Sequence, residues 1–138
     1  MPDATRLMTT VPLDLPLDAA HVAEAIEALG GAALACTTCA DASLGNGDAE
    51  ELHACVRACI TASDVCAVAA RTLSRAGGYD VPVVRNLLEA AAKACATCGE
   101  ICDQHADVHK HCRVCEEACR RAEQAVQQLL VNLAAVLV

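Results

Sequence analysis

Aromatic side chains are almost absent from this chain of 138 residues, which contains no Trp, no Phe and a single Tyr, Tyr79. Most globular cores rely on aromatic and large aliphatic side chains for their buried surface. Here alanine, leucine, valine and cysteine must build the interior instead. Because small side chains let helices approach closely, this composition favours closely packed helices around a single core.

Three further absences narrow the function classes. No stretch approaches the ~20 uninterrupted apolar residues of a membrane-spanning helix. The first 16 residues lack the basic start and the apolar run of a secretory signal. Basic residues are also not in excess, since the net charge is −8, and this argues against nucleic acid or an anionic membrane as a partner. We therefore expect a soluble, cytoplasmic protein.

Hydrophobic periodicity and helix caps predict an all-α fold. Asp18, Asp48, Asp80 and Asp107 are suitable N-cap residues, and Asp48 with Glu51 forms a capping box. Glycine-containing turns separate the first three predicted helices, and a short His-rich connection precedes the fourth. The pair Gly30 and Gly31 falls inside the first predicted helix, where it weakens the helix or allows close helix contact. The predicted helices span residues 18–43, 48–76, 80–105 and 107–137.

Short turns between these helices predict an up-down-up-down antiparallel four-helix bundle. The bundle occupies residues 18–138 as one domain. Residues 1–17, which include three prolines, are expected to form an irregular N-terminal leader.

Cysteine is the most informative residue that is present. The count of 11 is odd, and in a reducing cytosol this argues against a disulfide framework. The spacing is mostly i, i+3, i+4 or i+7, which places the thiols of each predicted helix on one face. We consider all of them candidate metal ligands: Cys36, Cys39, Cys55, Cys59, Cys66, Cys95, Cys98, Cys102, Cys112, Cys115 and Cys119.

The predicted topology brings ten of these thiols to one half of the bundle core. They lie near the end of the first and third helices and near the start of the second and fourth, which meet at the same end of the molecule. Cys66 is the exception, since it lies roughly 27 Å from the predicted start of its helix at 1.5 Å per residue. For Cys66 alone, simple packing as a small hydrophobic side chain is the better explanation.

Soft metal ions suit such a site. Thiolate-rich surroundings that are poor in carboxylates select Cu(I), Zn(II) or an iron-sulfur cluster. Zinc and iron-sulfur sites usually take four ligands from loops, whereas Cu(I) accepts two or three thiolates and suits pairs along helix faces. A structural or redox protein with zinc or an iron-sulfur cluster and a copper metallochaperone remain alternatives, although a metallochaperone would expose one or two thiols on a loop.

The sequence resembles the cysteine-rich copper storage protein family. The resemblance is carried by CxxC and CxxxC repeats on all four predicted helices and by the segment HKHCRVCEEAC, and it covers the chain from about Asp18 onward. It implies a cytosolic protein that stores multiple Cu(I) ions inside the bundle, often as a homotetramer, with histidines near the cysteine-rich end serving copper uptake. Family members can carry cysteine along nearly the whole bundle, whereas one half is apolar here, so a lower capacity is expected.

Four histidines fall near the thiol-rich end and are candidates for copper uptake: His53, His105, His109 and His111. Solvation at exposed turns is their alternative role, and His21 lies at the other end. An enzyme would need a nucleophile with a positioned base or an open metal position beside a substrate pocket. The sequence indicates neither, so we expect no catalytic activity.

Overall fold

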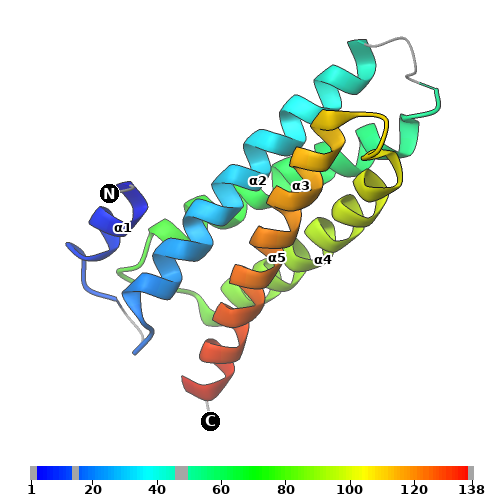
Figure 1. Cartoon of the computed structure of the whole chain (residues 1–138). Coiled ribbons are helices and arrows are strands. Elements are labelled where there is room, and N and C mark those ends of the chain that lie inside the picture. Colours follow the sequence, from blue (N-terminus) through cyan, green and yellow to red (C-terminus); the bar gives the residue numbers. More distant parts are fainter. Residues whose placement is uncertain (1–2, 14–15, 46–49, 137–138) are drawn as a thin grey trace.

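The structure is a computed structural model that describes residues 3–13, 16–45 and 50–136. In the described residues, the four long helices of the chain run alternately up and down, with a short helix beside the first of them (Figure 1). This arrangement confirms the predicted all-α four-helix bundle. The helices are α1 (Asp3–Met8), α2 (Ala19–Gly45), α3 (His53–Ser74), α4 (Val81–His105) and α5 (Lys110–Val136).

Each long helix packs against two neighbours, so the four surround one core. α2 packs against α3 and α5, and α4 packs against the same two helices. The α2–α3 and α4–α5 connections lie at one end of the bundle and the α3–α4 connection lies at the other (Figure 1). We call these the thiol end and the apolar end, after the residues that fill the core beside them.

The leader is not wholly irregular as predicted, because α1 occupies Asp3–Met8. Ala4 and Met8 lie one turn apart and are buried, and α1 packs against α2. The backbone N–H of Ala4 donates a hydrogen bond to Glu27 Oε1 at 3.1 Å. Burial of these apolar side chains and the Glu27 contact hold a helix that periodicity over so short a stretch does not reveal.

Two predicted caps are confirmed. Asp18 Oδ1 accepts a hydrogen bond from the N–H of Ala20 at 2.8 Å, and α2 then continues to Gly45, two residues beyond the predicted end. Asp80 accepts from the N–H of Val83 at 3.4 Å at the start of α4. Gly30 does not mark a close helix contact, because a Cβ there, as at Gly31, would meet no neighbouring atom within 4 Å.

The predicted starts of the other two helices are wrong. α3 begins at His53 rather than at residue 48, because residues 50–52 form a turn in which the N–H of His53 bonds the carbonyl of Glu50; Asp48 itself lies outside the described residues. α5 begins at Lys110 rather than at Asp107, because the N–H groups of residues 108 and 109 bond the carbonyl of His105. These contacts extend the end of α4, and the Asp107 carboxylate instead forms an ion pair with Arg113 at 3.6 Å.

The apolar end supplies the large buried side chains. Leu29, Leu73, Leu88 and Leu129 are almost fully buried there. The Tyr79 hydroxyl donates a hydrogen bond to the carbonyl of Leu73 at 2.6 Å, and burial raises the pKa of Tyr79 to about 12. This end of the core contains no cysteine among the described residues, so it stabilises the bundle without any metal.

Two bundle helices, α2 and α3, are long and apolar enough to cross a membrane by length and composition, with a mean hydropathy of 1.3. Core helices of helical bundles share this property. In both helices the buried positions face the neighbouring helices, while Asp41, Arg57 and Asp64 are exposed on the outer surface. The apolar character of α2 and α3 is therefore accounted for by their alanines and cysteines in the bundle core.

The core of the apolar end predicts a stable metal-free protein. We expect full helical circular dichroism without metal, and we expect Leu129→Ala to lower the free energy of unfolding by about 2–5 kcal/mol, since it leaves a cavity. Val131→Ala on the same helix is the control, because Val131 is exposed and its truncation should cost less than about 0.5 kcal/mol. Urea unfolding followed by circular dichroism measures both, and a metal-free chain without helical signal would contradict the expectation.

Candidate metal centre

All 11 cysteines are free and buried in the core. α2 contributes two of them and each other bundle helix contributes three, spaced three, four or seven residues apart. Since these spacings repeat on one helix face, every bundle helix directs its thiols toward the bundle axis. The structure thus brings together side chains that lie up to 83 residues apart in sequence.

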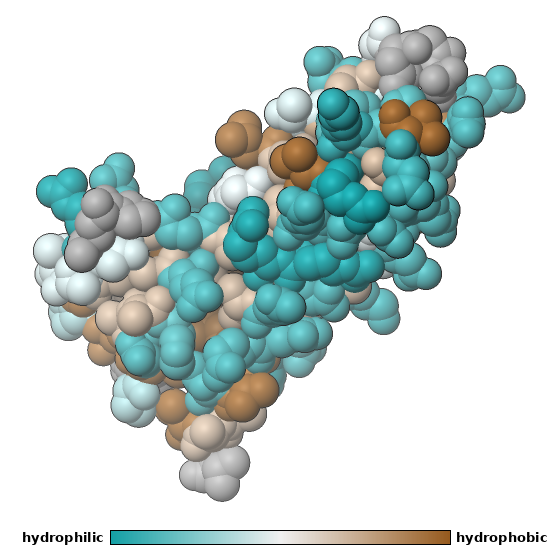
Figure 2. Space-filling model, viewed as in Figure 1, coloured by the Kyte–Doolittle hydropathy of each residue, from teal (hydrophilic) through white to brown (hydrophobic). Residues whose placement is uncertain are grey.

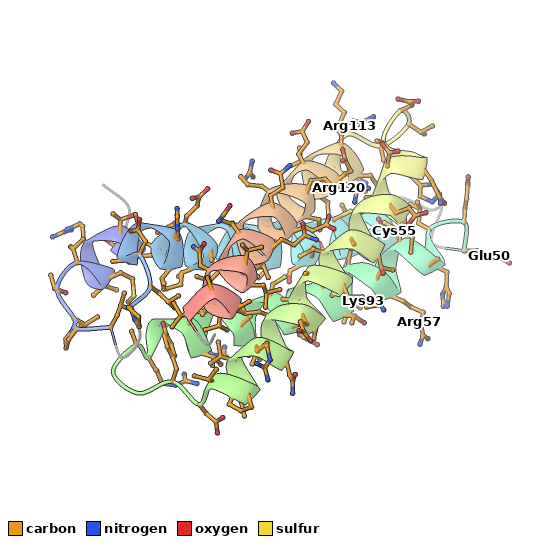
Figure 3. All side chains as sticks on the ribbon, turned by 90° about the horizontal axis from the view of Figure 1, so that it is seen from below. Glu50, Cys55, Arg57, Lys93, Arg113 and Arg120 are labelled. Carbon is orange, nitrogen blue, oxygen red and sulfur yellow. The ribbon has the colours of Figure 1, made fainter. Side chains whose placement is uncertain are left out.

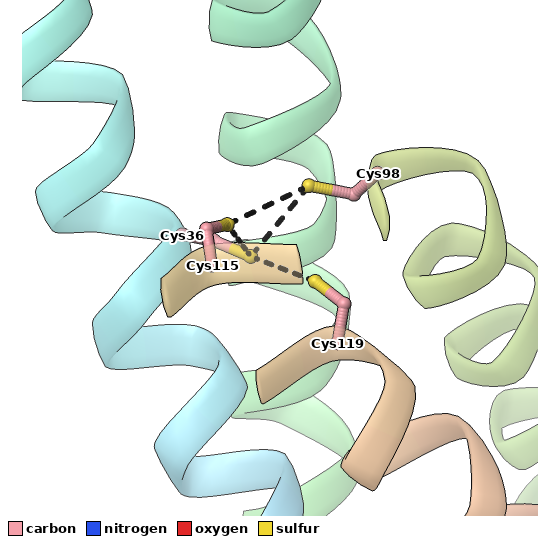
Figure 4. A group of neighbouring side chains, drawn as sticks. All are labelled: Cys36, Cys98, Cys115 and Cys119. Atoms are coloured by element: carbon pink, nitrogen blue, oxygen red, sulfur yellow. Dashed lines mark hydrogen bonds between the residues drawn. The ribbon is translucent and has the colours of Figure 1, made fainter. Parts of the chain in front are cut away.

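One close group of thiols comes from three helices. Figure 4 shows Cys36 of α2, Cys98 of α4 and both Cys115 and Cys119 of α5 pointing toward one another. The Sγ atom of Cys36 lies 3.5 Å from that of Cys119, 3.6 Å from that of Cys115 and 3.8 Å from that of Cys98. Four thiolates bound to one zinc at ~2.3 Å would have sulfurs ~3.8 Å apart, so this group alone suits a single tetrahedral ion as well as Cu(I).

Cys59 of α3 connects this group to further cysteines of the core. Its sulfur lies 3.6 Å from Cys98, 3.8 Å from Cys115, 3.9 Å from Cys102 and 4.0 Å from Cys55. One sulfur thus has four sulfur neighbours. A mononuclear site has no need for such sharing, whereas a multinuclear cluster with bridging thiolates requires it.

Nine cysteines belong to groups whose sulfur atoms all lie within 4.8 Å of one another. The groups overlap, because Cys39 and Cys115 each belong to two of them. We call these nine cysteines the thiol network. The groups are Cys36, Cys98, Cys115 and Cys119; Cys39, Cys59, Cys102 and Cys115; and Cys39, Cys55 and Cys112.

The remaining two cysteines form a pair that the sequence did not predict. The Sγ atoms of Cys66 and Cys95 lie 3.3 Å apart. The expected depth of Cys66 suggested an isolated core residue, and this interpretation is wrong. The depth was overestimated because α3 begins five residues later than predicted, which places Cys66 about 20 Å from the start of the helix at 1.5 Å per residue.

The four candidate histidines differ in their distance from the thiols. His111 Nδ1 lies 3.3 Å from Cys39 Sγ and 3.6 Å from Cys112 Sγ. The ring of His109 lies beside that of His111, with centroids 5.4 Å apart. His105 is half-buried at the last residue of α4, and His53 is exposed at the first residue of α3. The structure thus brings His111 into direct contact with the thiol network, with His109 next to it.

His21 lies away from the thiols, as expected. Its Nδ1 atom accepts a hydrogen bond from Asn132 Nδ2 at 2.7 Å, which joins α2 to the far part of α5.

Neighbouring thiols and burial perturb the ionisation of the network. Hydrogen bonds with Cys102 and Cys115, together with burial, raise the pKa of Cys59. Burial and the charge of Cys39 raise the pKa of Cys112. The hydrogen bonds from Cys102 and Cys115 lower the pKa of Cys39. A first thiolate is therefore stabilised by the S–H groups around it, whereas further ionisation is opposed.

An ion-pair network beside the thiol end was not anticipated. Arg113 of α5 pairs with Glu116 at 3.0 Å, with Asp103 of α4 at 3.2 Å and with Asp107 of the α4–α5 turn at 3.6 Å. The sequence predicts only a capping role for Asp107. Arg113 instead uses its two aspartate partners to hold the turn, which follows His105 and contains His109, against α5.

Arg120 continues this network one helix turn further on. It pairs with Glu116 at 3.4 Å and with Glu123 at 3.5 Å, and its guanidinium lies over Gly99, where a Cβ would be 3.2 Å from Arg120 Cζ. Figure 3 labels Arg113 and Arg120 along the same side of α5. Because Gly99 has no side chain, the guanidinium of Arg120 from α5 can lie against the surface of α4.

Ser43 is a buried polar residue at the thiol end that the sequence analysis did not predict. Its side chain is fully buried, and its hydroxyl oxygen has no hydrogen-bond partner among the described residues. Its spacing could have indicated this burial, since Ser43 lies four residues after Cys39 and continues the core face of α2 toward the turn.

Comparisons with known proteins agree with the geometry. The sequence profile of the family described as Csp, copper storage protein, matches residues 18–131. The solved structure of the copper storage protein Ccsp from Streptomyces lividans loaded with 10 copper equivalents is 45% identical, with a TM-score of 0.90, over 94% of this chain and 98% of that chain.

Two further structures of the Streptomyces lividans protein are also similar. One, described as a cytosolic copper storage protein loaded with five coppers, is 47% identical, with a TM-score of 0.79, over 81% of this chain and 93% of that chain. The other is a mutant with one histidine changed to alanine; it is 46% identical, with a TM-score of 0.83, over 85% and 98% of the two chains. A search of curated proteins finds no match.

The raised thiol pKa values predict proton release on metal binding. Thiols whose pKa is raised by burial, such as Cys112, hold their protons at pH 7, but only the thiolate binds a soft metal ion. We therefore expect about one proton released per thiolate formed and tighter binding as the pH rises from about 6 to 8. An indicator dye in weak buffer measures the protons during Cu(I) addition, with protein-free buffer as the control, and loading without proton release would contradict this ionisation state.

Proposed function

The chain belongs to the copper storage protein family, and from this premise we propose that it stores multiple Cu(I) ions in the core of its bundle. The observation that carries the proposal is the thiol network, in which groups of three or four sulfurs overlap through shared members. The solved relative loaded with 10 copper equivalents supports it. A single-ion site would need only one of these groups.

Charge balance favours a ratio near one Cu(I) per sulfur. A Cu(I) ion bound by two thiolates carries a net charge of −1, and several such charges in a low-dielectric core are costly. If each thiolate bridges two ions, the number of ions equals the number of thiolates and the cluster is neutral. The sulfur separations of 3.5–4.0 Å around Cys36 and Cys59 support bridging of this kind.

All 11 cysteines are proposed ligands, and they act in two sets. The nine members of the thiol network form the main cluster. The Cys66–Cys95 pair, with sulfurs 3.3 Å apart, can hold a further ion after a small separation of the two side chains. Hydrogen bonding between Cys95 and Cys119 links this pair to the main cluster.

The histidines are proposed to guide uptake rather than to store copper. Soft thiolates bind Cu(I) more tightly than imidazole does. His111 is the first of the four in this role, because its Nδ1 atom contacts both Cys39 and Cys112. His109 lies next to it, and His105 and His53 occupy more peripheral positions around the same end.

The other expectations follow the same reasoning. We propose a cytoplasmic protein, supported by the relative described as cytosolic, and a homotetramer, as the family resemblance implies. Catalysis, nucleic-acid binding and membrane association are not part of the proposed function, since the thiols are buried and the net charge is −8. Burial of every thiol also argues against a metallochaperone, which must present thiols to a partner.

Titration against a Cu(I) chelator tests the stoichiometry. We expect saturation at about one ion per clustered thiol, because bridging neutralises the cluster. Cys59→Ala with Cys115→Ala should lower the capacity by at least two ions, since these sulfurs have several neighbours each. Cys66→Ala is the matched control from outside the main cluster and should cost at most one ion. Saturation at one ion, or zinc bound more tightly than Cu(I), would reject copper storage.

Substitution of the histidines tests their role. We expect His111→Ala to slow Cu(I) loading while the saturated stoichiometry changes by less than one ion, because thiolates outcompete imidazole for Cu(I). Stopped-flow loading and equilibrium titration measure the two quantities. His21→Ala is the control, since His21 contacts Asn132 instead of a thiol. A variant that loads at the normal rate but holds fewer ions would show that His111 is a storage ligand.

A further inference from the structure

A groove on the side of the bundle opens onto the thiol network. It lies between α2 and α5 and has a volume of about 450 Å³, which is within the ~300–1,000 Å³ range of small-molecule sites. Its lining includes Leu34, Thr38 and Cys39 of α2 and His111, Val114 and Arg121 of α5. The groove is separate from the turns that close the thiol end.

Cys39 connects this groove to the core. Its sulfur lies 3.3 Å from His111 Nδ1 at the floor of the groove, and Cys39 belongs to two of the three overlapping groups of the thiol network. An ion taken up by Cys39 is therefore already adjacent to the other five members of those groups, which are Cys55, Cys59, Cys102, Cys112 and Cys115. The groove offers a route to the network that does not cross the bundle end.

The groove walls suit a molecule with an apolar part and a negative charge. Leu34 of α2 and Val114 of α5 are 71% and 60% exposed, and Thr38 is a polar residue of the lining. In Figure 2, apolar side chains form isolated patches on the mainly hydrophilic α2–α5 face of the thiol end. Such exposed apolar side chains beside a groove can contact the carbon skeleton of a ligand.

Arg121 supplies the charge. Arg113 and Arg120, on the same helix, are both engaged in ion pairs, whereas Arg121 forms none with the residues that the structure describes. It lies between the groove and a neighbouring polar hollow that includes Glu24. In a chain with a net charge of −8, an unpaired guanidinium beside an apolar groove favours a small anion over a cation.

We propose that this groove binds the carrier that delivers copper, an anionic complex of one Cu(I) with two small thiols that bear carboxylates. This inference rests on the proposed storage function. The complex has the required character, since each thiol has a short carbon skeleton and the assembly is negatively charged. The volume of about 450 Å³ suits such a molecule and is too small for the surface of a protein donor.

The transfer is a ligand exchange without a change of oxidation state. The Cys39 sulfur forms a bond to Cu(I), and the bond between Cu(I) and one carrier thiolate breaks. Cys39 reacts as the thiolate, so the displaced carrier ligand leaves as a thiolate as well. A second exchange, with a sulfur of the network such as Cys112 at 3.9 Å from Cys39, frees the other carrier ligand as a neutral thiol that carries away the Cys112 proton.

Charge introduced into the groove wall tests the proposal. Val114→Glu places a carboxylate in the groove, and Val131→Glu is the matched control, because Val131 is an equally exposed valine further along α5. The donors are the Cu(I) complex of glutathione, which is anionic, and that of cysteamine, which is cationic. We expect Val114→Glu to slow transfer from the glutathione complex about fivefold, as one added charge at short range would, and to leave the cysteamine rate unchanged or faster.

A second pair of variants guards against local rearrangement. Arg121→Gln should slow the glutathione donor in the same direction, whereas Arg71→Gln, at an exposed position on α3, should have no effect. Rates that are equal in Val114→Glu and Val131→Glu, or a Val114→Glu variant that slows both donors alike, would overturn the proposal. A change of oligomeric state in Val114→Glu, measured by analytical ultracentrifugation, would assign the groove to a second copy of the chain and would also overturn it.

The equilibrium capacity separates this inference from the proposed function. All variants should reach the stoichiometry of the unaltered chain, because neither Val114 nor Arg121 supplies a storage ligand. If the unaltered chain holds several Cu(I) ions but the groove variants load normally, only the carrier site is wrong. If the unaltered chain fails to hold more than one ion, the storage function itself is wrong.

Discussion

A thiol packs in a protein core as a small apolar group while it is protonated, but it becomes a buried charge when it ionises to bind metal. The core of this bundle must satisfy both states at 11 positions. In the metal-free state, burial raises the pKa of thiols such as Cys112 and favours their neutral form. In the loaded state, neutrality has to come from the ions. The overlap of the sulfur groups at Cys39 and Cys115 allows this, since a bridging thiolate balances one Cu(I) ion.

This constraint also explains the division of the bundle into two ends. Cysteine and alanine bury little apolar surface per residue, so a core made of them alone would stabilise four helices weakly. Leu29, Leu73, Leu88 and Leu129 compensate at the apolar end. Storage and stability are thus assigned to different parts of one continuous core. The cost is capacity, because the positions occupied by leucine cannot hold copper.

The fold and the position of the thiols could be predicted from the sequence, because both depend on periodicity, which every turn of a helix repeats. The exact helix starts could not, since they depend on single backbone hydrogen bonds in the turns. A turn at residues 50–52 precedes α3, and the backbone bonds of residues 108 and 109 to the carbonyl of His105 extend the end of α4 past Asp107. The error at α3 also produced the wrong depth for Cys66. Its pairing with Cys95 was hidden for the same reason.

The groove could not be predicted from the sequence, because it depends on how the outer faces of two neighbouring helices lie relative to each other. Leu34 and Val114 read as ordinary surface residues in their own helices, and only the packing of α2 against α5 places them on either side of Cys39. The network has two approaches, the groove and the bundle end. At the bundle end, Arg113 forms ion pairs with Asp103 of α4 and Asp107 of the α4–α5 turn.

His111 lies where these two approaches meet. It borders the groove, its ring is next to that of His109 near the turn, and its Nδ1 atom contacts Cys39. In the proposed uptake, an ion that arrives from either direction therefore encounters the same histidine and the same thiol first. Because Cys39 shares its groups with sulfurs from the other three helices, the ion can then pass inward by exchange between neighbouring sulfurs, and each step replaces one copper–sulfur bond with another. The same network that neutralises the stored copper thus provides the path along which it moves.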